Sequence, residues 1–84
     1  MPTVLYINGW RFFFFAEEGN EPMHIHAEKG EKNCKFWIYE KTHSIEAVYY
    51  YRMNSRDKRD VRKIILDKFD LFVDEWIRFQ KRMT

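Results

Sequence analysis

Hydrophobic residues before residue 54 come in short runs separated by polar turns, a pattern that is typical of β-strands. The runs predict strands over residues 3–7, 10–17, 23–28, 35–40 and 44–52. Asn8-Gly9, between the first two runs, is the dipeptide that best tolerates the positive φ angles of a hairpin turn. Residues 18–22 and 41–43 predict further turns, and residues 29–33 predict a polar loop. Consecutive strands joined in this way form an antiparallel meander.

After residue 54 the hydrophobic residues recur at spacings of three and four, which indicates a helix. This stripe consists of Val61, Ile64, Ile65, Phe69, Phe72, Trp76, Phe79 and Met83. Asn54 or Ser55 is suited to capping the first N–H groups of the helix. Additional apolar residues widen the stripe, so we expect either burial on two sides or a kink near residues 68–70. The helical segment is therefore expected within residues 55–82, as one long helix or two short ones.

The two halves together predict an α+β fold, in which a sheet of four to five strands packs one face against the C-terminal helical segment. We expect residues 1–84 to form a single domain. Both faces of the sheet are apolar, because Phe36 and Ile38 point to one side while Trp37 and Tyr39 point to the other. One helical segment covers only one face. We therefore expect the second, aromatic sheet face to bind a protein partner or to form a homodimer.

Charge and composition limit the binding partners, the cellular location and the cofactors that we expect. Fifteen Lys and Arg residues against thirteen Asp and Glu residues leave a formal charge of +2, which permits nucleic-acid binding but does not indicate it. The apolar runs are too short to span a bilayer and no secretory signal pattern is present, so we expect a cytoplasmic protein without a membrane segment. Cys34 is the only cysteine, which excludes an intrachain disulfide. Glycine-rich phosphate-binding motifs are absent, and we expect no cofactor.

The most distinctive string in the chain is Glu-Pro-Met-His-Ile-His-Ala-Glu, over residues 21–28. On a strand, His24, His26 and Glu28 point to the same side, with about 7 Å between successive positions. Two imidazoles and one carboxylate in a row can carry acid–base or metal chemistry. His24, His26 and Glu28 are therefore the candidate catalytic residues.

Three interpretations of this row stay open. Imidazole and carboxylate suit a metal ion, but a closed site needs three or four ligands, and nothing in the sequence brings His43 or Cys34 to the row. We therefore assign no metal ligands. Alternatively, two imidazoles transfer protons to and from a phosphodiester, with Arg11, Lys35 or Arg52 stabilising the negative charge. The simplest interpretation is structural, with the imidazoles hydrogen-bonded to neighbours such as the nearby carboxylate.

Aromatic and basic residues of the predicted sheet are candidates for binding. Phe13, Phe15, Trp37 and Tyr39 together resemble the base-stacking platforms of proteins that bind single-stranded RNA. In so aromatic a chain the same residues also suit a core or an interface. The candidate binding residues are Arg11, Arg52, Trp37 and Tyr39.

The chain resembles the small bacterial proteins of the family called domain of unknown function 4160. The resemblance lies in a glycine-containing turn before an aromatic strand, a Pro-x-His-x-His-x-Glu-x-Gly segment and a C-terminal helix with aromatic residues. The residues that match the segment are Pro22, His24, His26, Glu28 and Gly30. Met23 departs from the family pattern, which commonly has a first histidine at that place. The resemblance implies no settled activity; it implies gene neighbours that look like DNA-binding or toxin–antitoxin components.

These observations lead to one main hypothesis and two alternatives for function. We expect a small interaction or regulatory module that acts through its sheet face, such as one component of a toxin–antitoxin pair. The first alternative is a ribonuclease-like enzyme in which Glu28 orients one of the imidazoles of His24 and His26, and Arg11 or Arg52 contacts the phosphate. The second alternative is a metal-binding module built on the His-x-His strand.

Overall fold

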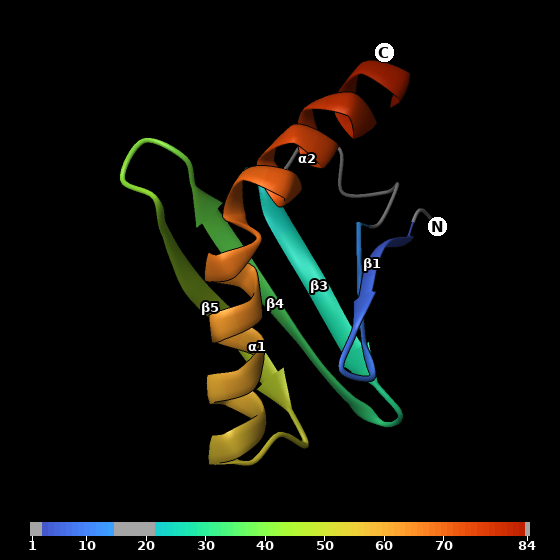
Figure 1. The fold of residues 1–84 in the computed structure, drawn as a ribbon, viewed down its shortest axis with the longest axis vertical. Coiled ribbons are helices and arrows are strands. Elements are labelled where there is room, and N and C mark those ends of the chain that lie inside the picture. Colours follow the sequence, from blue (N-terminus) through green and yellow to red (C-terminus); the bar gives the residue numbers. More distant parts are fainter. Residues whose placement is uncertain (1–2, 15–21, 84) are drawn as a thin grey trace.

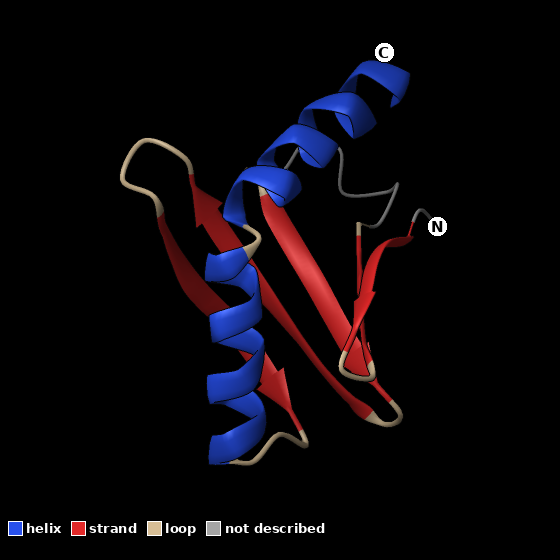
Figure 2. Ribbon diagram, viewed as in Figure 1, coloured by secondary structure: helices blue, strands red, loops and turns tan. Residues whose placement is uncertain are grey.

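The computed structural model describes residues 3–14 and 22–83 of the chain. The strands in these ranges are β1 (Thr3–Ile7), β2 (Trp10–Phe13), β3 (His24–Lys29), β4 (Lys32–Tyr39) and β5 (Ser44–Tyr51), and the helices are α1 (Ser55–Asp67) and α2 (Phe69–Met83). The strands pair antiparallel in the order β1-β2-β3-β4-β5, so each strand lies beside its neighbours in the sequence (Figure 1). Figure 2 shows both helices on the same side of this open sheet. The predicted α+β fold, with a meander sheet followed by helices, is confirmed.

The β1–β2 turn and the β3–β4 turn are short because residues with positive φ occupy them. Asn8 (φ 53°) and Gly9 (φ 85°) reverse the chain between β1 and β2, as the sequence predicts. Gly30 (φ 61°) does the same between β3 and β4, where Lys29 pairs directly with Lys32. The predicted polar loop over residues 29–33 is therefore wrong. A glycine that adopts a positive φ without strain lets the strands continue almost to the reversal.

Strands β3 and β4 end within one residue of the prediction, and the ends of β2 and β5 differ from it as follows. The described part of β2 ends at Phe13, and its predicted continuation through residues 15–17 lies outside the described residues. β5 ends at Tyr51, one residue before the predicted end, because Arg52 has a φ of 57°. This left-handed conformation is incompatible with a continued strand and turns the chain toward α1.

The core lies between the helices and one face of the sheet, which we call the inner face. Its most buried sheet side chains are Phe12, Ile25, Ala27, Cys34 and Phe36. The Phe12 ring lies 5.3 Å from the Phe72 ring, and the Phe14 ring meets the Trp76 ring edge-on at 5.2 Å. Aromatic pairs of this kind contribute about 0.5–1.5 kcal/mol each beyond the burial of their area. The contacts between β2 and α2 therefore fix α2 on the sheet.

The helical segment breaks at Lys68, within the predicted region, so it forms two short helices. Lys68 has φ −109° and ψ 22°; its N–H donates to the Ile64 carbonyl, and its own carbonyl accepts from the Phe72 N–H. The break lets α1 lie over the sheet while α2 continues past the sheet's end (Figure 1). Neither helix of the described residues is long and apolar enough to cross a lipid bilayer.

A capping box fixes the start of α1 and links it to β4. The Asn54 side chain accepts from the Asp57 N–H at 2.8 Å, and the Asp57 carboxylate accepts from the Asn54 N–H at 3.2 Å. The same carboxylate lies 2.9 Å from Lys32 Nζ. The hydrogen bond from Lys32 is the main cause that holds the pKa of Asp57 below its usual value.

We predict that Asp57→Asn lowers the free energy of unfolding at neutral pH and that this loss disappears in acid. The carboxyl has a lower pKa in the folded than in the unfolded protein, so its stabilisation is present above the unfolded pKa of about 3.9 and is lost as the pH falls through the folded pKa. Urea unfolding of both proteins, from about pH 7 to about pH 3, measures the difference. Asp74→Asn, an exposed site on α2, is the control. A difference that stays constant over this range contradicts the prediction.

Candidate functional site

The face of the sheet opposite the helices, which we call the outer face, brings the candidate residues together. Cross-strand pairing places Phe13 beside His26, His26 beside Lys35, and Lys35 beside Tyr49. Side chains two residues apart on a strand share a face. The outer face is therefore a grid of rows across β2, β3, β4 and β5, and the row through His26 lies near its middle.

His24 begins the next row and is completely buried. Its Nδ1 lies 2.8 Å from the Pro22 carbonyl oxygen. A carbonyl only accepts, so Nδ1 carries the proton and donates it to this bond. The ring contacts the rings of His26, Trp37 and Trp76, with centroid distances of 5.3, 5.8 and 4.8 Å. His24 thus links the outer face to α2, at the end of the sheet where β3 begins.

His26 is also buried, with 3% of its surface exposed. Its ring stacks on Phe13 at 5.3 Å, with an angle of 16° between the two planes. Lys35, its cross-strand neighbour, is 7% exposed and holds Nζ 4.7 Å from the centre of the Trp37 ring. A lysine over an aromatic face is stabilised by the ring's negative surface. This part of the outer face is a closely packed cluster of rings with a cation among them.

Glu28, the third candidate on β3, forms a salt bridge with Arg11. The Arg11 guanidinium donates to the Glu28 carboxylate at 2.7 Å and lies 4.3 Å above the Phe13 ring. Arg52 lies at the far end of β5, beside the β3–β4 turn, where it approaches Glu31 at 3.5 Å. The structure therefore brings Arg11, but not Arg52, into the cluster around the imidazoles.

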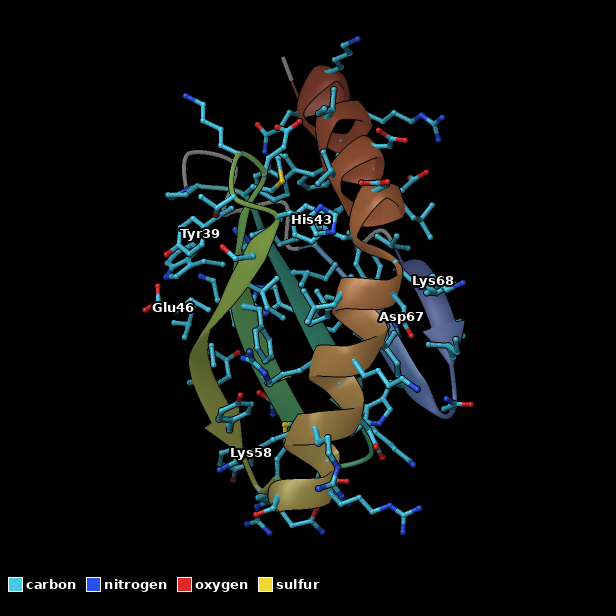
Figure 3. The ribbon with its side chains drawn as sticks, turned by 60° about the vertical axis from the view of Figure 1, so that its left-hand side comes forward. Tyr39, His43, Glu46, Lys58, Asp67 and Lys68 are labelled. Carbon is cyan, nitrogen blue, oxygen red and sulfur yellow. The ribbon has the colours of Figure 1, made fainter. Side chains whose placement is uncertain are left out.

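The remaining candidates, Trp37 and Tyr39, lie on β4. Trp37 is half-buried between His24 and Glu46, its neighbours across the sheet. Tyr39 is exposed, and its hydroxyl donates to the Glu46 carboxylate at 2.6 Å, which raises the pKa of Tyr39. Figure 3 shows Tyr39 and Glu46 at the side of the sheet away from the helices. Trp37 therefore belongs to the packed cluster, whereas Tyr39 belongs to the surface.

The outer face is thus divided into a buried half and an exposed half. The buried half, on β2, β3 and the centre of β4, contains Phe13, His24, His26 and Lys35. The exposed half, on the end of β4 and on β5, contains Tyr39, Tyr49 and Tyr51, whose surfaces are 42%, 41% and 48% exposed. The pattern of β5 did not make these last two tyrosines candidates. The signal in the sequence was their spacing, since residues two apart on a strand share a face; only the structure pairs Tyr49 with Lys35 and so places both tyrosines on the outer face.

This geometry limits the chemistry that the histidine pair can perform. A general base must come within hydrogen-bond reach of the proton that it removes, yet the surfaces of His24 and His26 are 0% and 3% exposed. In the described part of the chain, no three His, Cys, Asp or Glu side chains are grouped so that they can hold a metal ion. The contacts described above for the two imidazoles are ring packing and, for His24, a hydrogen bond to the Pro22 carbonyl.

Comparison with known proteins supports the resemblance noted in the sequence. A family model described as "Domain of unknown function (DUF4160)" matches residues 9–77, most of the chain. The chain belongs to the DUF4160 family. No curated protein and no solved structure matches it. The DUF4160 match covers the chain from the β1–β2 turn to the middle of α2. It therefore includes the buried half of the outer face, with His24 and His26.

We predict that His24→Ala lowers the free energy of unfolding by about 2–4 kcal/mol, because it removes a buried ring and leaves the Pro22 carbonyl without this donor. Chemical denaturation followed by tryptophan fluorescence measures the loss. His43→Ala is the matched control: this imidazole is exposed in the β4–β5 turn and contacts Phe69 on one side. If His24→Ala and the native protein have the same free energy of unfolding, the prediction is wrong and the His24 ring does not stabilise the fold.

We also predict that the Cys34 thiol does not react in the folded protein. Burial raises its pKa to about 12, so the reactive thiolate is scarce near neutral pH, and the side chain is fully enclosed in the inner face. Alkylation by iodoacetamide, followed by mass spectrometry, is expected to be complete in denaturant and very slow without it. Rapid labelling of the folded chain would contradict this prediction.

Proposed function

We propose that this chain is a protein-interaction module that associates through β5 and the exposed half of the outer face, and that its partner is a second copy of the same chain. The proposal rests on one observation: exposed aromatic side chains and an unpaired strand edge lie on the same strand. The exposed tyrosines Tyr49 and Tyr51 lie on β5 itself, and β5 is the last strand of the sheet. Apolar surface and an open strand edge therefore meet at the same place.

The edge of β5 is suited to strand pairing. It is eight residues long, and within the described residues no strand lies on its far side. Edge strands that avoid association usually carry lysine, proline or inward-pointing charges. Here the only charged residue between Ser44 and Tyr51 is Glu46. Val48, at the register shift, is 41% exposed and adds apolar surface to the edge.

A second copy of the chain fits this edge because an antiparallel pair of identical strands is self-complementary. A two-fold axis places the same patch on both subunits and joins two five-stranded sheets into one continuous sheet. The Tyr49 and Tyr51 side chains of both copies then lie together on one face. The formal charge of +2 produces only weak repulsion between the two copies.

A regulatory role, such as that of a toxin–antitoxin component, stays a prediction from the family resemblance. The ribonuclease-like alternative has less support, because the imidazoles of His24 and His26 are enclosed and Glu28 is bonded to Arg11. The metal-binding alternative finds no cluster of ligands among the described residues. Association through β5 is the function that the exposed surface supports best.

We predict that the native chain forms dimers and that Tyr49→Lys weakens them at least about tenfold, because it brings two like charges together at the two-fold axis and removes apolar contact. Size-exclusion chromatography with light scattering over a range of concentrations measures the dissociation constant. Circular dichroism checks that the variant is folded.

Tyr6→Lys is the matched control for this experiment. Tyr6 is 70% exposed on β1, at the opposite edge of the sheet, so the same substitution there is expected to leave the dimer intact. A native chain that stays monomeric at high concentration contradicts the proposal. Dissociation by Tyr6→Lys, with Tyr49→Lys still dimeric, contradicts it as well.

A further inference from the structure

A cleft of about 420 Å³ lies between the β1–β2 turn and the flank of α1, on the helix side of the sheet. Asn8 lines it from the turn, Lys29 from the end of β3, and Arg56 and Lys63 from α1. Figure 3 shows the end of α1, with Asp67 and Lys68, on the side of the helix that faces the β1–β2 hairpin. The volume falls in the range of small-molecule sites, about 300–1,000 Å³.

The lining of this cleft is predominantly cationic. Four of its nine lining residues are Lys or Arg, and two are Asp. One of these carboxylates, Asp60, is offset by Arg56 at 3.9 Å. Lys29 and Lys63 form no ion pair with any described carboxylate. The formal charge of the whole chain is only +2, so much of its excess positive charge is gathered at this one place.

The stem of Lys29 lies over the β1–β2 turn. A Cβ atom at Gly9 would lie 2.9 Å from Lys29 Cε, so the lysine stem passes directly over the turn. Lys29 Nζ lies 5.9 Å from the centre of the Trp10 ring. Lys29 thus connects the turn to the wall of the cleft.

The other groups of the cleft match a phosphorylated ligand that also has an apolar part. Ile7 and Ile64 provide apolar wall, and the Asn8 amide provides a neutral donor. Phosphate oxygens accept well from ammonium groups and from amides. A neighbouring hollow, across Lys29, is lined by Lys32 and Arg52, but these two cations already have Asp57 and Glu31 as partners. The cleft beside α1 is thus the better anion site.

We propose that this cleft binds the phosphate of a nucleoside phosphate or of a nucleic-acid backbone, with Lys29 and Lys63 as the ligands of the phosphate and the two isoleucines against the sugar or base. The chemistry is the same for both sources: phosphate oxygens attached to an apolar ring system. The proposal does not depend on the association of β5, because the cleft lies on the opposite side of the sheet.

The test is a titration of the full chain, followed by amide NMR, with ADP, a short single-stranded RNA and adenosine as separate probes. ADP or the RNA is expected to shift the amide signals of Asn8, Gly9 and Lys63, whereas adenosine shifts none of them. Binding is expected to weaken as salt is added, since the ligands are exposed cations. Tighter binding of ADP than of RNA indicates a free nucleotide as the source, and the reverse indicates a nucleic acid.

Two variants distinguish binding in the cleft from nonspecific attraction of an anion to the positively charged protein. Lys29→Gln and Lys63→Gln, which change exposed side chains, are each expected to weaken binding about fivefold. Lys41→Gln removes the same charge from the β4–β5 turn and is expected to have no effect. If neither phosphorylated probe shifts the cleft signals, the proposal is wrong. It is also wrong if Lys41→Gln weakens binding as much as the two cleft variants do.

Discussion

Two short helices cover only one face of a five-stranded sheet, and the rest of the structure depends on this constraint. α1 and α2 take the inner face, where the ring contacts of Phe12 with Phe72 and of Phe14 with Trp76 fasten α2 to β2 and to the residue that follows it. The outer face has no helix lying over it. Where β2, β3 and β4 meet, its rings contact one another across the strands, and His24 also contacts Trp76 of α2. Toward β5 this packing ends, and tyrosines stay exposed.

The histidine pair is best understood as part of this packing. An imidazole is flat enough to stack, and it carries a donor that satisfies a nearby carbonyl, so it suits a crowded sheet face that still contains polar backbone. His26 stacks on Phe13, and His24 bridges β3, β4 and α2 while donating to Pro22. The His-x-His segment therefore lies at the junction of sheet and helix.

The two sides of the molecule offer different kinds of surface. The exposed half of the outer face is aromatic and ends in an edge strand with one charged residue, which favours another protein chain. The cleft beside α1 is rich in lysine and arginine and is lined by residues from three separate elements, which favours a small anionic group.

The sequence by itself determined the order of the elements, because hydrophobic periodicity and turn residues act locally. The Asn8-Gly9 turn was visible in it, Asn54 was one of two candidates for the cap, and a break near residues 68–70 was one of two alternatives for the helical segment. It also placed His24, His26 and Glu28 on one face, since strand alternation is strict. Only the tertiary structure decided which residues lie opposite one another. The partners of Glu28 and Lys35, the enclosure of the imidazoles and the cleft at Lys29 all arise from pairing between segments distant in sequence. Such pairing depends on register and packing, which leave no periodic signal in the chain.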